Sequence, residues 1–429
     1  MMATETGTSI SEVFPGGSRV NELGRLEIGG CDAIEVAREY GTPAYLVAED
    51  DLRARARAYL QGAGEPGLAG LAVAFASKAF PCTAVLELFA EEGLWCDVAS
   101  GGELHLALRA GFDASRLVLH GNAKSRSELE SALAIGVGFV VLDNFDELDR
   151  LADLLADGAL GERSSQPVLI RATPDVRGET HAKISTGQAD SKFGFSMADV
   201  PRAIARVGEI EGLQLRGMHA HIGSQLFDLD AFRRCAEQLA TLGSFPVFDL
   251  GGGLGVPYTA EQRAPSIADY LAALAEAVRE HLPRHELLLL EPGRSLTAPS
   301  CVTLYTVESV KRNVSTWVAV DGGMSDNLRP MLYDAPYEAH VADRMFGAAP
   351  CVLAGKHCES GDVIVGNALL DDPRAGDVIV TPVTGAYTYA MANNYNGVCR
   401  PPVIFCKDGD ARVVVRRETH EDLGARDVG

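Results

Sequence analysis

The sequence is poor in positive charge. It carries 38 Lys and Arg residues against 59 Asp and Glu, which gives a formal net charge of −21 at pH 7. Nucleic acids and anionic membranes both bind basic surfaces, so we expect neither as a partner. An anionic small molecule would need local cations or helix N-termini, because the overall field repels it.

Features of membrane and secreted proteins are also missing. The nine cysteines stand singly, without a Cys-x-x-Cys pair, which favours free thiols in a reducing compartment. No stretch approaches the roughly 20 apolar residues of a membrane span. The opening residues, MMATETGTSI, have neither the basic segment nor the apolar core of a signal peptide. We therefore expect a cytoplasmic protein.

Short β-rich runs alternate with helical patterns over roughly residues 45–300. The eight runs are LAVAF (71–75), LWCDV (94–98), RLVLHG (116–121), GFVVLD (138–143), PVLIRA (167–172), LQLRGMHAH (213–221), PVFDLG (246–251) and ELLLLE (286–291). Between them lie stretches such as CTAVLELFAEEG, with apolar residues three and four apart. Eight parallel strands in this alternation predict a (β/α)8 barrel. A doubly wound sheet seldom continues for eight units.

The pattern changes at about residue 301. CVTLYTVESV, GDVIVTPV and ARVVVRR are β-branched, are bounded by Gly, Pro and Asp, and show little helical spacing. They predict a C-terminal, mostly β domain of antiparallel strands, a sandwich or barrel. LEIGG and TPAYLV near the N-terminus can complete it. We expect residues 1–44 to join the β domain, residues 45–300 to form the barrel and residues 301–429 to form the C-terminal domain.

Polar residues follow the predicted barrel strands, at the end where barrels carry their catalytic residues. In chain order they are Lys78, Asp97, Asn122, Asp143, Arg171, His219 with His221, Gly251 to Gly253, and Glu291 with Arg294. A single polar residue at a strand end is most often a cap. Polar residues at all eight ends together predict a ligand site.

Two of these ends suit a phosphorylated cofactor. Three successive glycines in DLGGGLG let backbone amides approach an anion, and EPGR adds Glu291 and Arg294 beside them. Phosphate sites of such barrels follow strands seven and eight. A cofactor aldehyde that forms a Schiff base with Lys78 would explain the other end. Glu291 would then face a pyridine nitrogen, and His221 would stack on the ring.

The pair HAH (219–221) allows an alternative. Residues two apart on a strand share a face, so His-x-His is also a ligand pattern of metal-dependent barrel hydrolases. That alternative leaves Lys78 and the glycine run unexplained.

Ten motifs, running in order from about residue 40 to the C-terminus, resemble the diaminopimelate decarboxylase family. They are FASKAF, CDVASGGEL, HGNAKS, STGQADSKFGF, HAHIGSQ, DLGGGLG, EPGRSL, VDGGMSDNLRPMLYDA, GKHCESGD and GAYTYAMANNYN. This family belongs to the alanine-racemase-like, fold-type III enzymes. The resemblance implies pyridoxal 5′-phosphate as cofactor, a (β/α)8 barrel with a C-terminal β domain, and a homodimer with active sites at its interface.

The resemblance also implies roles for individual residues. Lys78 would hold the cofactor covalently, and Cys358 would be the proton donor. Cofactor contacts would come from His221, Ser224, Gly251, Gly252, Gly253, Glu291 and Tyr387; we add Asp97, Arg171, Gly293 and Arg294 from the strand ends. Substrate contacts would come from Arg294, Arg329, Tyr333, Glu359 and Tyr387, with Cys358 and Glu359 supplied by the neighbouring subunit.

We expect decarboxylation of meso-2,6-diaminopimelate to L-lysine, the last step of lysine biosynthesis. A diamino diacid has a second carboxylate, and Arg329 in RPMLY can bind it through two parallel N–H bonds. The nearest rival is the same chemistry on a related amino acid in secondary metabolism, because the sequence does not place the pocket loops. A racemase fits less well, since the resemblance implies that Cys358 donates a proton from one side only, and a non-catalytic homologue would usually lack the lysine.

Overall fold

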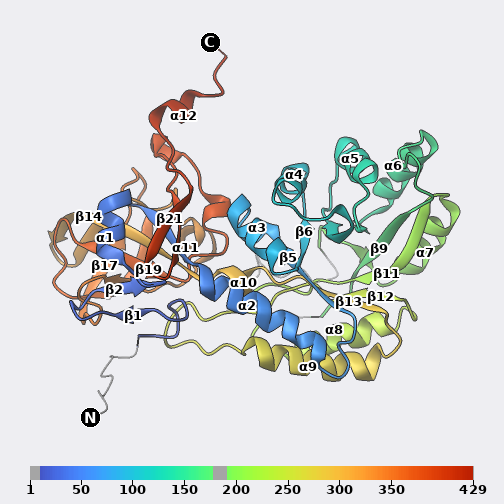
Figure 1. Cartoon of the computed structure of the whole chain (residues 1–429), viewed down its shortest axis with the longest axis horizontal. Helices are drawn as coiled ribbons and strands as arrows, with labels where there is room; N and C mark the ends of the chain where they lie inside the picture. The colour runs from blue at the N-terminus through green and yellow to red at the C-terminus, as the bar shows by residue number, and fades with distance from the viewer. Residues whose placement is uncertain (1–9, 177–190, 429) are drawn as a thin grey trace. The chain divides into compact units, whose positions relative to one another are not determined.

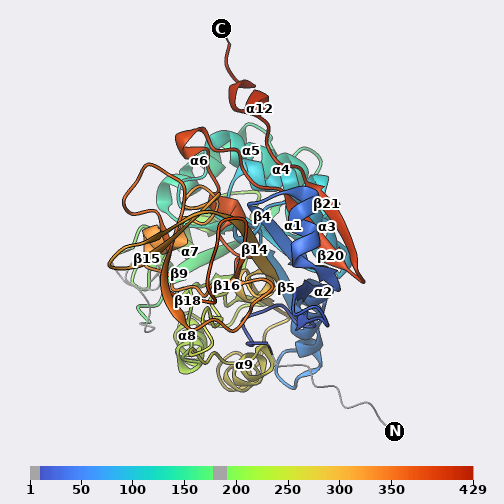
Figure 2. The same ribbon diagram turned by 90° about the vertical axis from the view of Figure 1, so that its left-hand side faces the viewer.

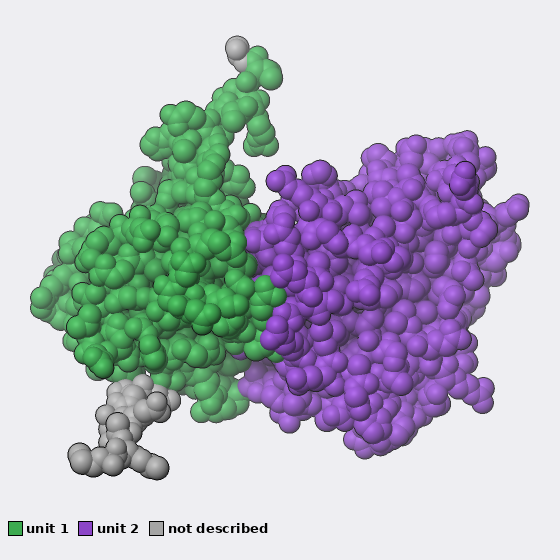
Figure 3. Space-filling model, in the orientation of Figure 1, with its two compact units in different colours: residues 1–54, 257–263, 296–429 green, residues 55–256, 264–295 purple. Residues whose placement is uncertain are grey.

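The computed structural model describes residues 10–176 and 191–428, and contacts divide the chain into two compact units (Figure 3). The β unit contains Met1–Ala54, Pro257–Arg263 and Leu296–Gly429, and the barrel unit contains Arg55–Val256 and Ala264–Ser295. Residues 45–54 and 296–300, placed in the barrel by the sequence pattern, thus make most of their contacts in the β unit. None of the helices in the described part of the chain is long and apolar enough to cross a membrane.

A ring of eight parallel strands forms the barrel unit, which confirms the predicted barrel. The strands are β5 (Leu71–Ala76), β6 (Trp95–Val98), β7 (Leu117–Leu119), β8 (Phe139–Leu142), β9 (Gln166–Thr173), β11 (Leu213–His219), β12 (Val247–Asp249) and β13 (Leu287–Leu290). The pairs β8–β9 and β13–β5 close the ring. A short additional strand, β10 (Phe195–Ser196), pairs with β9.

Helices lie along the outside of these strands in Figure 1. They are α2 (Glu49–Gln61), α3 (Thr83–Glu91), α4 (Gly101–Arg109), α5 (Arg126–Ile135), α6 (Phe145–Ala156), α7 (Val200–Glu209), α8 (Asp230–Ala240) and α9 (Ile267–His281), followed by the short α10 (Arg294–Thr297). Reciprocal capping boxes begin two of them, through Ser125 with Glu128 and Ser266 with Asp269. Each box satisfies two backbone N–H groups that the helix itself leaves unpaired.

Apolar side chains fill the barrel interior. The buried cluster consists of Ala72, Val118, Phe139, Val141, Leu169, Val247 and Leu289, with Trp95 and Leu287 packed against it. Trp95 stacks on Phe139 at 6.2 Å between ring centroids. These residues precede the polar positions along their strands, so the polar strand ends lie above a packed floor rather than over an open channel.

A nine-stranded sheet dominates the β unit. Its main path runs β18 (Val363–Leu370), β17 (Ala349–Ala354), β15 (Thr316–Val320), β14 (Cys301–Arg312), β4 (Ala44–Ala48), β20 (Val403–Lys407), β21 (Asp410–Val415), and β19 (Val378–Pro382) and β16 (His340–Val341) pair beside it. Figure 2 turns this unit toward the viewer. Because β4 pairs with both β14 and β20, N-terminal residues do complete the β domain.

Two pairings differ from the antiparallel arrangement expected for this domain. β15 pairs with β17 in parallel, and β4 pairs with β20 in parallel. Both pairs join strands that are distant in sequence, so no tight hairpin sets their direction. The smaller elements of the unit are β1 (Arg19–Val20), β2 (Leu26–Ile28), β3 (Cys31–Asp32), α1 (Ala33–Tyr40), α11 (Arg329–Tyr333) and α12 (His420–Gly424).

A buried ion pair between Lys124 and Glu147 lies at the C-terminal end of the barrel strands. The Lys124 ammonium donates to the carbonyl oxygens of Gly121 and Val141, each at 2.7 Å, and lies 2.8 Å from the Glu147 carboxylate. Both side chains are almost completely buried. The pair therefore joins the turn after β7, the end of β8 and helix α6.

We predict that Lys124→Met destabilises the protein by about 3–5 kcal/mol, because it leaves the Glu147 charge buried and unpaired. The double variant Lys124→Met/Glu147→Leu should regain most of this loss. Urea unfolding measures the free energy of unfolding of the single and the double variant. Arg126→Met is the matched control, since its pair with Asp157 is exposed and is worth about 1 kcal/mol or less. A Lys124→Met protein as stable as this control would contradict the assignment.

Candidate active site

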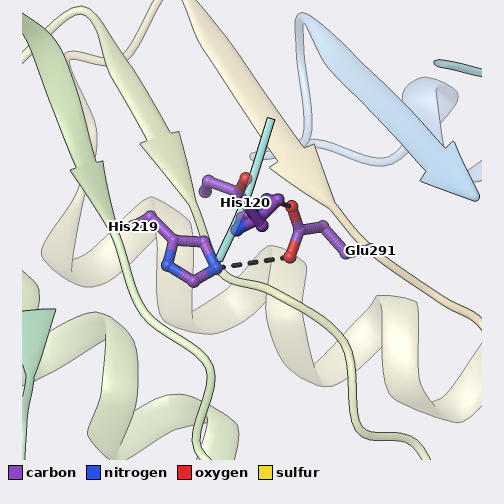
Figure 4. A group of neighbouring side chains, drawn as sticks. His120, His219 and Glu291 are labelled. Carbon is purple, nitrogen blue, oxygen red and sulfur yellow. Dashed lines mark hydrogen bonds and ion pairs between the residues drawn. The ribbon is translucent and has the colours of Figure 1, made fainter. Parts of the chain in front are cut away.

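Glu291 is a buried acid at the end of β13, and two histidines face it (Figure 4). The Nε2 atom of His120, which follows β7, lies 2.5 Å from Glu291 Oε1. The Nε2 atom of His219, at the end of β11, lies 3.3 Å from Oε2. Within the described part of the chain, neither Lys nor Arg forms an ion pair with Glu291.

The surroundings of Glu291 determine its protonation. Burial alone raises the pKa of Glu291, but His120 and His219 outweigh burial and hold this pKa well below its ordinary value. Burial, and then the nearby Glu291 charge, raise the pKa of Asp249 well above its ordinary value. Burial also lowers the pKa of His219 to about 3. At neutral pH, therefore, Glu291 carries a negative charge and His219 is neutral, while the Asp249 carboxyl binds a proton more readily than an exposed carboxyl does.

His120, His219, Asp249 and Glu291 form a cluster that can hold a cation. One ligand atom of each lies within 4.8 Å of the others, and all four side chains are buried. A divalent metal ion accepts such donors, and a protonated ring nitrogen suits the same negative charge. The predicted His-x-His metal pair is divided, because His221 Nδ1 instead accepts a hydrogen bond from the Gly252 amide at 3.1 Å.

Lys78 lies in a 3₁₀ turn, Ser77–Ala79, directly after β5. Its side chain is 46% exposed, and its Nζ lies 3.6 Å from Asp97 Oδ2. The other Asp97 oxygen lies 3.9 Å from His120 Nε2. Burial raises the pKa of Asp97, although Lys78 and His120 oppose this effect. Asp97 and His120 thus connect the Lys78 amine to Glu291 through three successive contacts.

The turn after β13 packs on the turn that carries Lys78. Pro292 accepts a backbone hydrogen bond from Ala76 at 3.1 Å. A Cβ atom at Gly293 would lie 3.1 Å from the Cβ atoms of Ala76 and Ala79. A larger residue at position 293 would therefore push the two turns apart, which explains the glycine.

The glycine run is needed mainly for close packing. A Cβ atom at Gly252 would lie 2.1 Å from the Glu291 carbonyl oxygen, and one at Gly253 would lie 2.5 Å from the Gly223 carbonyl oxygen. The Gly251 amide donates to Asp249 at 2.9 Å, and the Gly252 amide donates to His221. Two of the three amides expected to bind phosphate are therefore engaged within the protein.

Ser224 and Arg294 lie together beside this run. An Arg294 guanidinium nitrogen donates to the Ser224 hydroxyl at 2.8 Å. A hydroxyl and a guanidinium in contact provide several N–H and O–H donors for one anion. An anion bound here would be held more by these side chains than by the glycine amides, two of which are engaged within the protein.

Arg171 is buried near the C-terminal end of β9, where its backbone pairs with His219 at the end of β11. Its guanidinium lies 3.8 Å from the Asp143 carboxylate and 4.4 Å from the centre of the Phe193 ring. The first six residues of the motif STGQADSKFGF, residues 185–190, lie outside the described residues.

The remaining predicted site residues belong to the β unit. Arg329 begins α11 and is 5% exposed. Among the described residues no carboxylate pairs with it, and its Nε has no hydrogen-bond partner. Tyr333 ends α11 and is partly buried, as is Tyr387, whose φ is +63°. A buried guanidinium without a counter-ion calls for an anionic ligand, because an unpaired buried charge is costly.

Cys358 and Glu359 are exposed in the turn between β17 and β18. Asp362 organises this turn by accepting hydrogen bonds from the Met324 amide at 2.7 Å and from the His357 amide at 3.0 Å. The Cys358 amide donates to the Asn396 side chain at 3.0 Å. The Cys358 thiol therefore lies at the surface, on a turn that hydrogen bonds to Asp362 and Asn396 hold in place.

Known proteins decide the family. A model of the pyridoxal-binding domain of pyridoxal-dependent decarboxylases matches residues 50–298. Diaminopimelate decarboxylase from Bacillus subtilis is 45% identical over 96% of this chain and 97% of its own length, and that from Halalkalibacterium halodurans is 43% identical over 97% and 98%. The chain belongs to the diaminopimelate decarboxylase family. The crystal structure of the M. jannaschii enzyme with L-lysine matches 97% of the chain and 98% of its own at a TM-score of 0.90 and 31% identity.

The family's cofactor, pyridoxal 5′-phosphate, fits the barrel unit. Glu291 is a buried carboxylate that stays ionised without a Lys or Arg partner, so a protonated ring nitrogen would neutralise it. Lys78 would provide an amine at the rim, and Ser224 with Arg294 would provide donors for the phosphate. These are features of the chain itself and agree with the family assignment.

Sequence reasoning missed two members of this site. His120 is the penultimate residue of the run RLVLHG, and its strand-end position is the same signal that selected Asp97. Asp249 precedes the glycine run and looks like an ordinary turn residue. Its role becomes apparent only from its contacts with Gly251 and Glu291, which come from three-dimensional packing.

We predict that stability falls as the pH decreases from about 6.5 toward 3, partly because of His219. Its folded pKa of about 3 lies below the ordinary 6.5, so the unfolded chain binds a proton that the folded protein does not. His219→Gln should flatten this decline by up to about 1.4 kcal/mol per pH unit. Urea unfolding at several pH values measures the slope.

The control for this prediction is His105→Gln, because His105 is exposed on α4. The pKa of Asp249 is shifted in the opposite direction, and Asp249 is present in all of these proteins. Equal slopes for His219→Gln and the control would contradict the assignment of a neutral, buried His219.

Proposed function

We propose that this protein removes CO2 from meso-2,6-diaminopimelate to give L-lysine, the last step of lysine biosynthesis. Support comes from the diaminopimelate decarboxylases that match it at 43–45% identity over nearly the whole chain. The observation that carries the substrate class is Arg329, a buried guanidinium without a carboxylate partner in the described chain. A substrate that keeps one carboxylate after losing the other would supply that partner.

Pyridoxal 5′-phosphate, when bound, supplies an electron-accepting ring that stabilises the carbanion left by CO2. Lys78 would hold its aldehyde carbon. Glu291 would pair with the ring nitrogen, because the two histidines keep its carboxylate charged. Burial lowers the pKa of His221 well below its ordinary value, so a neutral imidazole would lie against the ring and add no competing charge.

We assign the phosphate end to Ser224, Arg294, the glycine run and Tyr387, with Asp97, Arg171 and Gly293 supporting the cofactor site. Asp97 would orient the Lys78 amine, from which it lies 3.6 Å. The Gly251 and Gly252 amides would act through Asp249 and His221, which accept their hydrogen bonds.

Substrate contacts would come from Arg329, Tyr333, Arg294 and Tyr387. An Arg–carboxylate hydrogen bond is worth roughly 1.5–3 kcal/mol, or about tenfold or more in affinity. An amino acid whose only carboxylate is the one removed as CO2 has no second carboxylate for Arg329. Binding of such a substrate would leave the Arg329 charge unpaired and is therefore disfavoured.

We further propose a cytoplasmic homodimer in which Cys358 and Glu359 serve the neighbouring subunit's site. Both residues are exposed on the β17–β18 turn, as a contribution in trans requires. Cys358 would return a proton to the carbon that lost CO2, and Glu359 would contact the distal amino group.

Product analysis tests the proposed reaction. With added pyridoxal phosphate, the purified protein should turn yellow and convert meso-diaminopimelate to L-lysine and CO2. Lys78→Ala should abolish both turnover and borohydride-trappable cofactor, whereas the helix-surface variant Arg109→Ala should retain both. Preference for ornithine, arginine or an N-acylated analogue would favour the rival, a related decarboxylase of secondary metabolism. A colourless wild-type protein that cannot be reconstituted would refute the mechanism.

Mixed subunits test the shared site. Lys78→Ala and Cys358→Ala should each be inactive alone. Mixed dimers should regain activity, because one of their two sites combines an intact Lys78 with an intact Cys358. Activity is measured after exchange has been demonstrated with differently tagged subunits. Exchange without any recovery would contradict catalysis in trans.

A further inference from the structure

Two tyrosines of the β unit enclose the Arg329 guanidinium. Its carbon Cζ lies 4.5 Å from the centre of the Tyr258 ring and 5.6 Å from that of Tyr337. The Arg329 Nη1 atom donates to the Tyr337 hydroxyl at 2.5 Å. Both tyrosines are buried, and their rings meet edge to face at 5.2 Å. We refer to Tyr258 and Tyr337 as the tyrosine clamp.

One half of the clamp comes from a short segment that lies between barrel residues in the sequence but belongs to the β unit. Tyr258 belongs to Pro257–Arg263, which follows DLGGGLGV yet makes its contacts in the β unit. The Glu338 carboxylate accepts a hydrogen bond from the Ala260 amide and thereby holds this segment. Its other oxygen lies 3.3 Å from His340 Nε2. The acid nearest to the clamp in sequence is thus occupied with other partners and does not neutralise Arg329.

A carboxylate beside Arg329 would hold the guanidinium in place, but it would also cancel its charge and repel an incoming carboxylate. An aromatic face and a hydroxyl oxygen stabilise a cation without carrying a formal negative charge. The tyrosine clamp can therefore orient Arg329 and leave its charge for a ligand. The Arg329 Nε, which has no hydrogen-bond partner in the described chain, remains as a donor.

We propose that Tyr258 and Tyr337 are positioning residues that determine selectivity for a substrate whose distal carboxylate survives the reaction. This inference rests on the proposed function. Removal of CO2 from one end of a diamino diacid leaves the other carboxylate in the product, so the clamp should affect substrate and L-lysine alike. It should not affect 1,5-diaminopentane, which is L-lysine without its carboxylate.

The test compares clamp variants of the holoenzyme with a matched control. Tyr258→Leu removes the ring face, Tyr258→Phe retains it, and Tyr337→Phe removes only the hydroxyl. Tyr45→Phe is the control, because it removes a buried tyrosine hydroxyl that donates to the Asp326 carbonyl oxygen at 2.5 Å. For each protein we would measure kcat, KM for meso-diaminopimelate, and inhibition constants for L-lysine and 1,5-diaminopentane.

Tyr258→Leu and Tyr337→Phe should each raise KM and the L-lysine inhibition constant roughly tenfold or more, since a desolvated cation loses one of its stabilising contacts. The value for 1,5-diaminopentane should stay within about twofold, as should kcat. Tyr258→Phe and the control should resemble wild type in all four constants. Cofactor absorbance and melting temperature show whether each variant is folded, and Tyr337→Phe carries the test if Tyr258→Leu does not fold.

The outcomes distinguish a failure of the proposed function from a failure of the tyrosine clamp. A wild-type protein that does not decarboxylate meso-diaminopimelate overturns the proposed function. A wild-type protein that does so, with clamp variants that leave KM and L-lysine inhibition unchanged, overturns the tyrosine clamp alone. Equal weakening of L-lysine and 1,5-diaminopentane also overturns it, because a merely structural role would affect both ligands.

Discussion

The negative charge on Glu291 is the constraint around which the barrel site is built. A carboxylate buried at the end of β13 would ordinarily take up a proton, since burial disfavours the charged form. Here His120 and His219 hold its pKa well below the ordinary value, while burial and the Glu291 charge raise the pKa of Asp249. Because these groups come from the ends of four different strands or the loops beside them, the closed ring is what brings them together.

A second buried charge of opposite sign occurs in the β unit. Arg329 lies against two aromatic rings and has no carboxylate partner in the described chain. Glu291 likewise has no Lys or Arg partner there. Arg329 thus keeps a charge without a carboxylate partner in the described chain, and Glu291 is balanced there only by histidines, which favours binding of complementary groups. In the proposed function, the ring nitrogen of the cofactor pairs with Glu291, and the distal carboxylate of the substrate pairs with Arg329.

Regular patterns in the sequence predicted the barrel and much of its site. Each βα unit repeats a short apolar run followed by a helix-period stretch, so the strand ends could be found by position, and Lys78, Asp97 and Glu291 were among them. His120 carried the same signal but was overlooked. Asp249, Tyr258 and Tyr337 carry no local signal, because their importance comes from contacts with residues distant in sequence.

Predictions were weaker where pairing is non-local. β17 pairs with β18 in the expected antiparallel sense, but its other partner, β15, lies parallel to it, and no hairpin marks this second pairing in the sequence. The glycine run was expected to bind phosphate through its amides, yet backbone packing against Glu291 and Gly223 explains the absence of side chains there. A run of glycines indicates that another group approaches the backbone closely, but it does not show whether that group is a ligand or another part of the chain.

The position of β4 has a consequence for synthesis of the chain. This strand, at residues 44–48, lies between β14 and β20, which begin at residues 301 and 403. About 250 residues separate β4 from the first of these partners, so at the usual ~5–20 residues per second the ribosome needs roughly 10–50 s to deliver it. Throughout that interval an entirely apolar segment, AYLVA, has both of its backbone edges open. A chain that terminates before residue 301 therefore lacks both strands that cover the edges of β4.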